Sequence, residues 1–166
     1  STSIAWKGVL YMLLSHAVAK AAMFMAAGNI LLFGGHDRIA DLDRVAQRLP
    51  LTLTAFSLAG VSIMGLPPSG GFIGKWLLLE AAIRSGQWWW AGVLILGGLL
   101  AAAYVFKVIG YAFIPAKITH EAGVVPARME WAALVLAIMA ILLGLFTSGP
   151  LALLEIGSPF GRGSAG

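Results

Sequence analysis

The sequence predicts an all-α integral membrane protein with about four transmembrane helices. Hydrophobic residues make up 60% of the chain and charged residues only 11%, whereas charged residues make up roughly 25% of an ordinary soluble domain. The mean hydropathy is +0.90. Apolar runs of more than about 18 residues recur, each long enough to cross a bilayer as a helix. We therefore expect a membrane domain over residues 1–150 and a tail over residues 151–166.

Composition also excludes several classes of function. The 166 residues include no cysteine, which rules out disulfides, thiolate metal sites and a cysteine nucleophile. The three histidines, His16, His36 and His120, lack the spacing of paired metal ligands, so no metal and no cofactor are expected. The net charge of +4 comes from basic residues scattered over loops and helix ends, without the basic stripe that nucleic-acid binding requires.

The first span is expected over about residues 4–33, with Trp6 and Tyr11 near one end, where amphipathic rings favour the headgroup region. Glycines at positions 34 and 35 end it. Apolar residues at helical spacing then alternate with charged ones, which predicts an interfacial amphipathic helix over about residues 38–49. Its apolar positions are Ile39, Leu42, Val45 and Leu49.

The second span is expected over residues 50–83 as a broken helix. The sequence GLPPSGG at residues 65–71 interrupts it, because prolines lack an amide donor and glycines favour non-helical backbone. Each half is about 20–25 Å long, so both are needed to cross about 30 Å of hydrocarbon. Backbone groups freed at the break must be covered by protein or line a wet cavity. The break residues are Gly65, Pro67, Pro68, Gly70 and Gly71.

The third and fourth spans complete the domain. The third is expected over residues 87–114, where tryptophans at positions 88–90 form an interfacial belt and Pro115 stops the helix. The fourth is expected over residues 131–147, followed by coil. Four crossings place both termini on one side of the membrane and the connections 34–50 and 115–130 on the other.

Charge then predicts the orientation. Five basic residues lie in the two connections and three on the terminal side. By the positive-inside rule the connections are cytoplasmic and both termini periplasmic, in a bacterial-type inner (plasma) membrane. The five are Arg38, Arg44, Arg48, Lys117 and Arg128, and the three are Lys7, Arg84 and Arg162.

Two ionisable residues, His16 and Lys20, lie in the middle part of the first span. Lys20 is near its middle, where an isolated ammonium costs at least about 2.5–3.5 kcal/mol, so a compensating role is expected. His16 is one turn earlier on the same helix face, and the two groups could pass a proton through one or two waters. The alternatives are that Lys20 snorkels to the headgroups and that His16 is a hydrogen-bonded packing residue.

Two further lysines lie in the later spans. Lys75 is four residues past the break, where it could load and release a proton as its surroundings change. Its alternative, an ion pair with Glu80, suits helical spacing poorly. Lys107 is near the end of the third span, where it could serve as an exit residue or snorkel to the interface. Glu80 itself fits an interfacial charge.

Two segments resemble a known family. SHAVAKAAMFMAAGNIL (15–31) and SIMGLPPSGGFIGKWLLLEAAI (62–83) are similar to the antiporter-like membrane subunits of respiratory complex I and of Mrp sodium/proton antiporters. Membrane-bound hydrogenases and some inorganic-carbon uptake systems have relatives too. Those subunits have about fourteen membrane helices in two inverted repeats with broken helices, and this chain resembles the last four.

The resemblance implies roles for individual residues. Lys20 matches the central lysine of a buried polar axis, His16 the histidine that precedes it, and Lys75 the lysine on the second broken helix, which gates the outer exit. Some complex I subunits carry glutamate at the position of Lys75, so this chain is more like the lysine-bearing members. The coil expected after the last span lacks the long lateral helix that one complex I subunit carries, a difference that truncation of the chain could also explain.

These observations favour a transporter function over two alternatives. We expect a C-terminal half-channel that translocates protons, or exchanges them for sodium, alongside other membrane subunits of a larger complex. That complex could be a redox-driven pump such as an NADH-quinone oxidoreductase, whose cofactors would belong to other subunits. A non-conducting membrane-anchor subunit would not need lysines at mid-depth. An intramembrane enzyme would need a nucleophile or metal motif, and the sequence has neither HExxH nor GxSxG.

Overall fold

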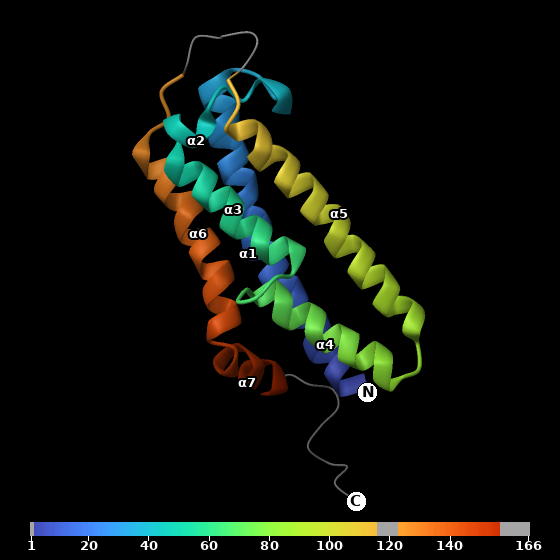
Figure 1. The fold of residues 1–166 in the computed structure, drawn as a ribbon. Coiled ribbons are helices and arrows are strands. Elements are labelled where there is room, and N and C mark those ends of the chain that lie inside the picture. The colour runs from blue at the N-terminus through green and yellow to red at the C-terminus, as the bar shows by residue number, and fades with distance from the viewer. Residues whose placement is uncertain (1, 116–122, 157–166) are drawn as a thin grey trace, which may run out of the picture.

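The fold is a bundle of helices, seen in a computed structural model that describes residues 2–115 and 123–156 (Figure 1). Three long helices, α1 (Thr2–Gly34), α5 (Trp88–Ala112) and α6 (Ala127–Leu145), are long and apolar enough to cross a membrane. Between α1 and α5 lie two 15-residue helices, α3 (Pro50–Met64) and α4 (Gly70–Arg84). The predicted all-α membrane fold with a broken second span is therefore confirmed.

Helix α1 runs through the centre of the bundle and packs against α3, α4 and α6 (Figure 1). Its inward face carries alanines, and Ala19, Ala22 and Ala26 are fully buried. Small residues at such interfaces let helix backbones approach closely, which is how membrane helices gain packing energy without a hydrophobic driving force. Helix α5 packs along α3 and α4 and leaves most of its surface exposed.

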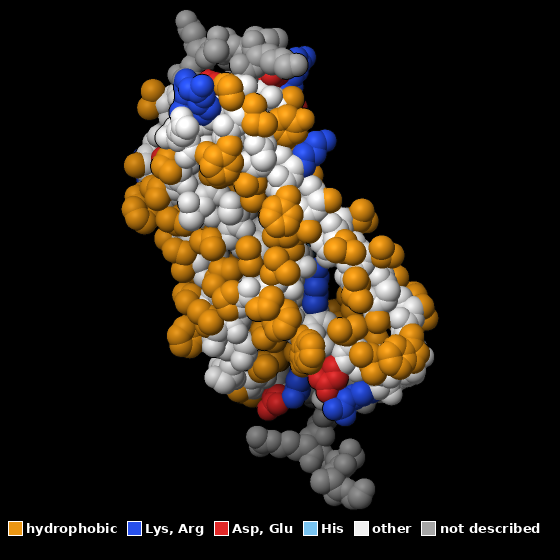
Figure 2. Space-filling model, viewed as in Figure 1, with side chains coloured by type: hydrophobic (Ala, Val, Ile, Leu, Met, Phe, Trp, Pro, Cys, Tyr) orange, Lys and Arg blue, Asp and Glu red, His pale blue; other side chains and the backbone are white. Residues whose placement is uncertain are grey.

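The outer surface of the bundle is mostly hydrophobic, as contact with lipid requires. Hydrophobic side chains cover most of the face in Figure 2, while charged ones gather towards its two ends, apart from one basic patch in a hollow near the middle. Trp88 and Trp89 are largely exposed at the start of α5, and the rings of Trp89 and Trp90 stack with centroids 4.1 Å apart. These rings occupy the position expected of an interfacial belt.

The predicted interfacial helix over residues 38–49 is not continuous. A 3-10 turn, η1 (Ile39–Asp41), and a single helical turn, α2 (Val45–Arg48), replace it. Between them Asp43 and Arg44 adopt positive φ angles of 40° and 57°, a left-handed conformation that ends a helix. Leu42, Val45 and Leu49 are buried in the protein core. The apolar spacing thus reflects packing against other helices and not contact with the bilayer.

The coil expected after the fourth span begins instead as a short helix, α7 (Ser148–Ile156). A proline inside a helix usually ends it, but Pro150 lies in the first turn of α7, where a missing amide hydrogen removes no helical bond. A Lys7–Glu155 ion pair joins α7 to the start of α1. The rest of the predicted tail, residues 157–166, lies outside the described residues.

Candidate functional site

The break between α3 and α4 covers residues 65–69, inside the range that the sequence predicts. Helix α3 ends because Gly65 adopts φ +78°, and the Gly65 amide donates to the carbonyls of Val61 and Ser62 at 3.1 Å. Ser69 is the N-cap of α4, and its hydroxyl accepts the amide of Phe72 at 3.2 Å. Both half-helices therefore have capped ends. The two ends meet within the bundle.

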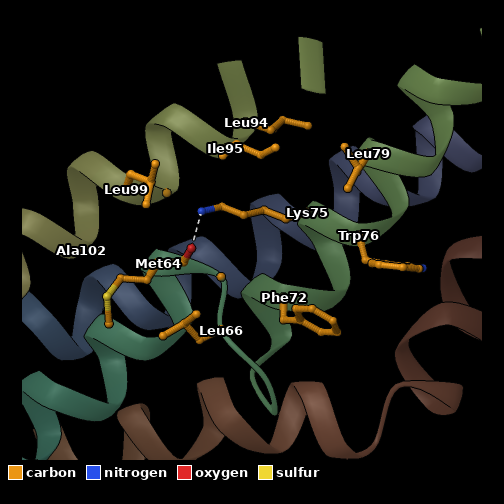
Figure 3. Close-up of a pocket in the computed structure, with 12 residues that line it drawn as sticks. Met64, Leu66, Phe72, Lys75, Trp76, Leu79, Leu94, Ile95, Leu99 and Ala102 are labelled. Atoms are coloured by element: carbon orange, nitrogen blue, oxygen red, sulfur yellow. Dashed lines mark hydrogen bonds between the residues drawn. The ribbon is translucent and has the colours of Figure 1, made fainter. Parts of the chain in front are cut away.

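The break positions Lys75 against the end of α3. The Lys75 ammonium donates to the carbonyl of Met64 at 2.7 Å (Figure 3). It also donates to the carbonyl of Ile63 at 3.2 Å. Carbonyls in the last turn of a helix lack intrahelical partners and form the negative end of the helix dipole. The carbonyls freed by the break thus find a hydrogen-bond partner in the Lys75 ammonium, and they stabilise its charge.

A cavity of about 360 Å³ lies beside Lys75, between the break and α5. Leu94, Ile95 and Leu99 of α5 face it across from Lys75 (Figure 3). Among the described residues that line the cavity, Lys75 alone is charged, and the others are apolar or glycine. Among these lining residues, Lys75 is therefore the one side chain that can carry a proton.

A chain of buried hydroxyls ties the break to α1. Ser62 on α3 lies 3.2 Å from Ser15 on α1, oxygen to oxygen, and its hydroxyl accepts the Gly71 amide of α4 at 3.3 Å. Both serines are buried. Ser15 directly precedes His16, and Gly71 is one helical turn before Lys75. The polar residues of α1 and α4 are thus mechanically linked through Ser62, a residue that sequence reasoning did not single out.

His16 and Lys20 are half-buried on α1. The Lys20 ammonium lies 5.7 Å from the centroid of the Phe24 ring, a cation–π distance. Lys75 is likewise half-buried, on α4. No hydrogen bond joins any two of these three side chains within the described ranges, so proton transfer among them would require water.

The structure separates the remaining predicted residues from this group. Lys107 is exposed on α5 and does not line the Lys75 cavity. Glu80 binds Arg84, one helical turn later, at 2.7 Å, so the alternative ion pair between Lys75 and Glu80 does not form. The break and Lys75 make one site, which the Ser15–Ser62–Gly71 hydrogen bonds connect to the part of α1 next to His16.

The family model described as "NADH:quinone oxidoreductase/Mrp antiporter, TM" matches residues 1–101, which include α1, the break and Lys75. The chain belongs to this family. A NADH-quinone oxidoreductase subunit N from Desulforudis audaxviator is 35% identical over 157 residues, covering 86% of this chain and 31% of the relative. Formate hydrogenlyase subunit 3 from Escherichia coli is 28% identical and covers 92% of this chain and 27% of the relative.

Antiporter proteins of the family are also similar. A Na(+)/H(+) antiporter protein of Bacillus subtilis is 27% identical over 107 residues, covering 64% of this chain and 22% of the relative. The structure of an Mrp complex from Dietzia sp. superposes with a TM-score of 0.79 at 26% identity, covering 93% of this chain and 36% of that chain. The chain thus spans about a third or less of the length of these proteins.

One polar cluster of this family member escaped the sequence analysis. Asn29 on α1, Thr52 on α3 and Glu130 on α6 meet at the end of the bundle that holds the 34–50 connection. In the sequence Glu130 belongs to the polar connection, because it directly precedes Trp131 and the fourth apolar run. An acidic residue in the first turn of a helix was the available signal.

Proposed function

We propose that this chain is the C-terminal half-channel of an antiporter-like subunit, and that it translocates protons, or exchanges protons for sodium. His16, Lys20, Lys75 and Lys107 carry the proton path. The observation that carries this proposal is the Lys75 ammonium at the break, held by two carbonyls beside an apolar cavity. The names of relatives in redox complexes and in sodium/proton antiporters support it.

At the break, the protonated and the neutral forms of the Lys75 amine are held differently. The protonated amine bonds to the carbonyls of Ile63 and Met64 and is stabilised by the negative end of the α3 dipole. The neutral amine gains far less from them, because hydrogen bonds of ionised groups are roughly twice as strong. Loss of the proton therefore frees the lysine to move. Water at the break would then carry protons between Lys75 and the His16–Lys20 pair, with Lys107 serving the connection end of α5.

The rest of the pathway belongs to partners. Helices from the remainder of a longer subunit and other membrane subunits of a multisubunit complex would cover the exposed face of α1, since the relatives are about three times as long. Redox cofactors, where the complex uses them, would sit in other subunits. In this arrangement the two connections face the cytoplasm and both termini of the segment face the periplasm of the inner membrane.

Substitution of the lysines in the full assembly tests the proposal. Lys20→Ala and Lys75→Ala should reduce proton uptake into vesicles at least about tenfold. Alanine has no group that can hold a proton, and an unheld charge inside the membrane is energetically costly. Lys75→Arg should fail as well, since a guanidinium does not release its proton. Lys107→Ala should have a smaller effect.

The driving reaction, measured in the same vesicles, is the control for assembly. Full proton uptake by both alanine variants would contradict the proposal and leave this segment as a non-conducting membrane anchor.

A further inference from the structure

A carboxyl group at the connection end of the bundle has no role in the pathway above. The Glu130 carboxylate accepts the Thr52 hydroxyl at 3.0 Å and the Thr52 amide at 3.3 Å. The Asn29 amide donates to the same hydroxyl at 3.2 Å. Thr52 is 0% exposed and Asn29 is 1% exposed. The carboxyl of α6 is thus hydrogen-bonded to α3 directly and to α1 through the Thr52 hydroxyl.

Glu130 differs electrostatically from the other acids on the described transmembrane helices and α7. Glu80 is paired with Arg84 and Glu155 with Lys7. Across residues 2–115 and 123–156 Glu130 forms no ion pair, and the hydrogen bonds it accepts come from uncharged donors. It can therefore gain a proton without breaking a salt bridge, which the two paired acids cannot do.

Among the described residues, the groups that hydrogen-bond to Glu130 are uncharged. Helix α3 carries no charged residue, and Asn29 is the polar contribution of α1. On α2, Arg48 is engaged with Asp43 at 3.3 Å. Arg128, two residues earlier on α6, is exposed. No described cation fixes the carboxyl in its ionised form.

The hydrogen-bond chain can adapt to either state of the carboxyl. In the ionised state it runs from Asn29 through the Thr52 hydroxyl to Glu130, because a carboxylate only accepts. In the protonated state the carboxyl donates to the Thr52 oxygen, which has a second lone pair for Asn29. The cluster thus holds together in both states, as a site that is loaded and unloaded in each cycle must.

A purely structural role makes a different prediction. Leu49, the N-cap of α3, supplies no side-chain hydrogen bond, so Glu130 could simply cap that helix from α6. A cap needs only an acceptor oxygen, which glutamine also has. We propose that Glu130 instead exchanges protons with water at the connection side and loads the pathway of this segment. This inference rests on the proposed function.

Glutamine substitution separates the two roles. In the full assembly reconstituted in vesicles, Glu130→Gln should keep the wild-type thermal stability but reduce proton uptake at least tenfold. Glu130→Ala should lose both, because it also leaves the α3 cap unmade. The matched control is Glu80→Gln at the opposite end, which should keep proton uptake within about twofold, since a surface ion pair contributes little. Wild-type uptake by Glu130→Gln would overturn the inference.

Two further measurements keep the inference falsifiable. If Glu130→Gln does not assemble, infrared difference spectra of the wild type and Glu130→Asp replace it. A carboxyl band that appears on acidification and shifts in the aspartate variant is expected, and its absence would overturn the inference. Lys20→Ala and Lys75→Ala run in parallel. Loss in both with full uptake by Glu130→Gln refutes the Glu130 inference alone, whereas full uptake by both lysine variants refutes the proposed function.

Discussion

Around Lys75, two glycines leave the space that the side chain occupies. A Cβ atom at Gly65 would lie 2.4 Å from Lys75 Cδ, and one at Gly98 would lie 3.2 Å from Lys75 Nζ and 3.1 Å from the Met64 carbonyl oxygen. Gly65 also needs its positive φ of 78°, which glycine adopts without strain. The ammonium reaches the carbonyls of α3 because α5 has no side chain at position 98.

Valine at position 98 should therefore displace the ammonium. A hydrogen bond to a charged group is worth about 1.5–3 kcal/mol, so Gly98→Val should lower proton uptake by about tenfold or more. The measurement is proton uptake in vesicles at matched protein content. The control is Gly97→Val, because a Cβ atom at Gly97 meets nothing within 4 Å. Equal loss in both variants would show that bulk on α5, and not the contact with Lys75, is responsible.

At the scale of elements, the break is held by α6 as well as by its own caps. A Cβ atom at Gly144 of α6 would lie 1.9 Å from the Pro68 carbonyl oxygen and 2.3 Å from the Ser69 carbonyl carbon. The Tyr11 hydroxyl of α1 donates to the Leu143 carbonyl next to it. Rigid backbone on both sides leaves no room for adjustment, so α1, the break and α6 are fixed together at this level.

Alanine at position 144 should therefore loosen the break. Overpacking of this kind typically costs about 1–3 kcal/mol, so Gly144→Ala should lower the thermal midpoint of the detergent-solubilised protein by several degrees. Gly110→Ala is the matched control, since its Cβ atom meets nothing within 4 Å and alanine favours a helix. An unchanged midpoint in Gly144→Ala would mean that the break is not clamped by α6.

On the scale of the whole molecule, charge is concentrated at the two ends, and its asymmetry predicts an orientation in the membrane. The connection end carries Arg38, Arg44, Arg48 and Arg128. At the terminal end, Lys7 and Arg84 are bound to Glu155 and Glu80. Cytoplasmic loops are enriched in lysine and arginine. We therefore keep the prediction that the 34–50 connection is cytoplasmic and the 85–87 turn is periplasmic.

Cysteine labelling can test this orientation directly, because the chain has no cysteine of its own. Asp37→Cys and Gln87→Cys introduce one thiol at each end, at positions that are exposed. In intact cells a membrane-impermeant maleimide should label the Gln87→Cys variant, and the Asp37→Cys variant only after permeabilisation. The unsubstituted chain gives the background. The reverse labelling pattern would invert the topology.

Much of the fold follows from local sequence features. The apolar runs predicted the spans, and two prolines among glycines predicted the break to within a few residues, because these effects act on the backbone itself. The same local reasoning was wrong for residues 38–49, where it assigned the apolar face of Leu42, Val45 and Leu49 to lipid. An apolar surface is buried equally well by lipid or by protein, so periodicity alone does not distinguish the two.

The sequence by itself determined that this is a membrane protein of the antiporter-like family, with titratable residues inside apolar helices and an interrupted span. The tertiary structure decided which polar groups meet. Lys75 binds carbonyls 11 and 12 positions earlier, and Thr52 meets Glu130 across 78 positions. Such pairings depend on the rotation and crossing of helices. Hydropathy and spacing along one helix carry no information about either.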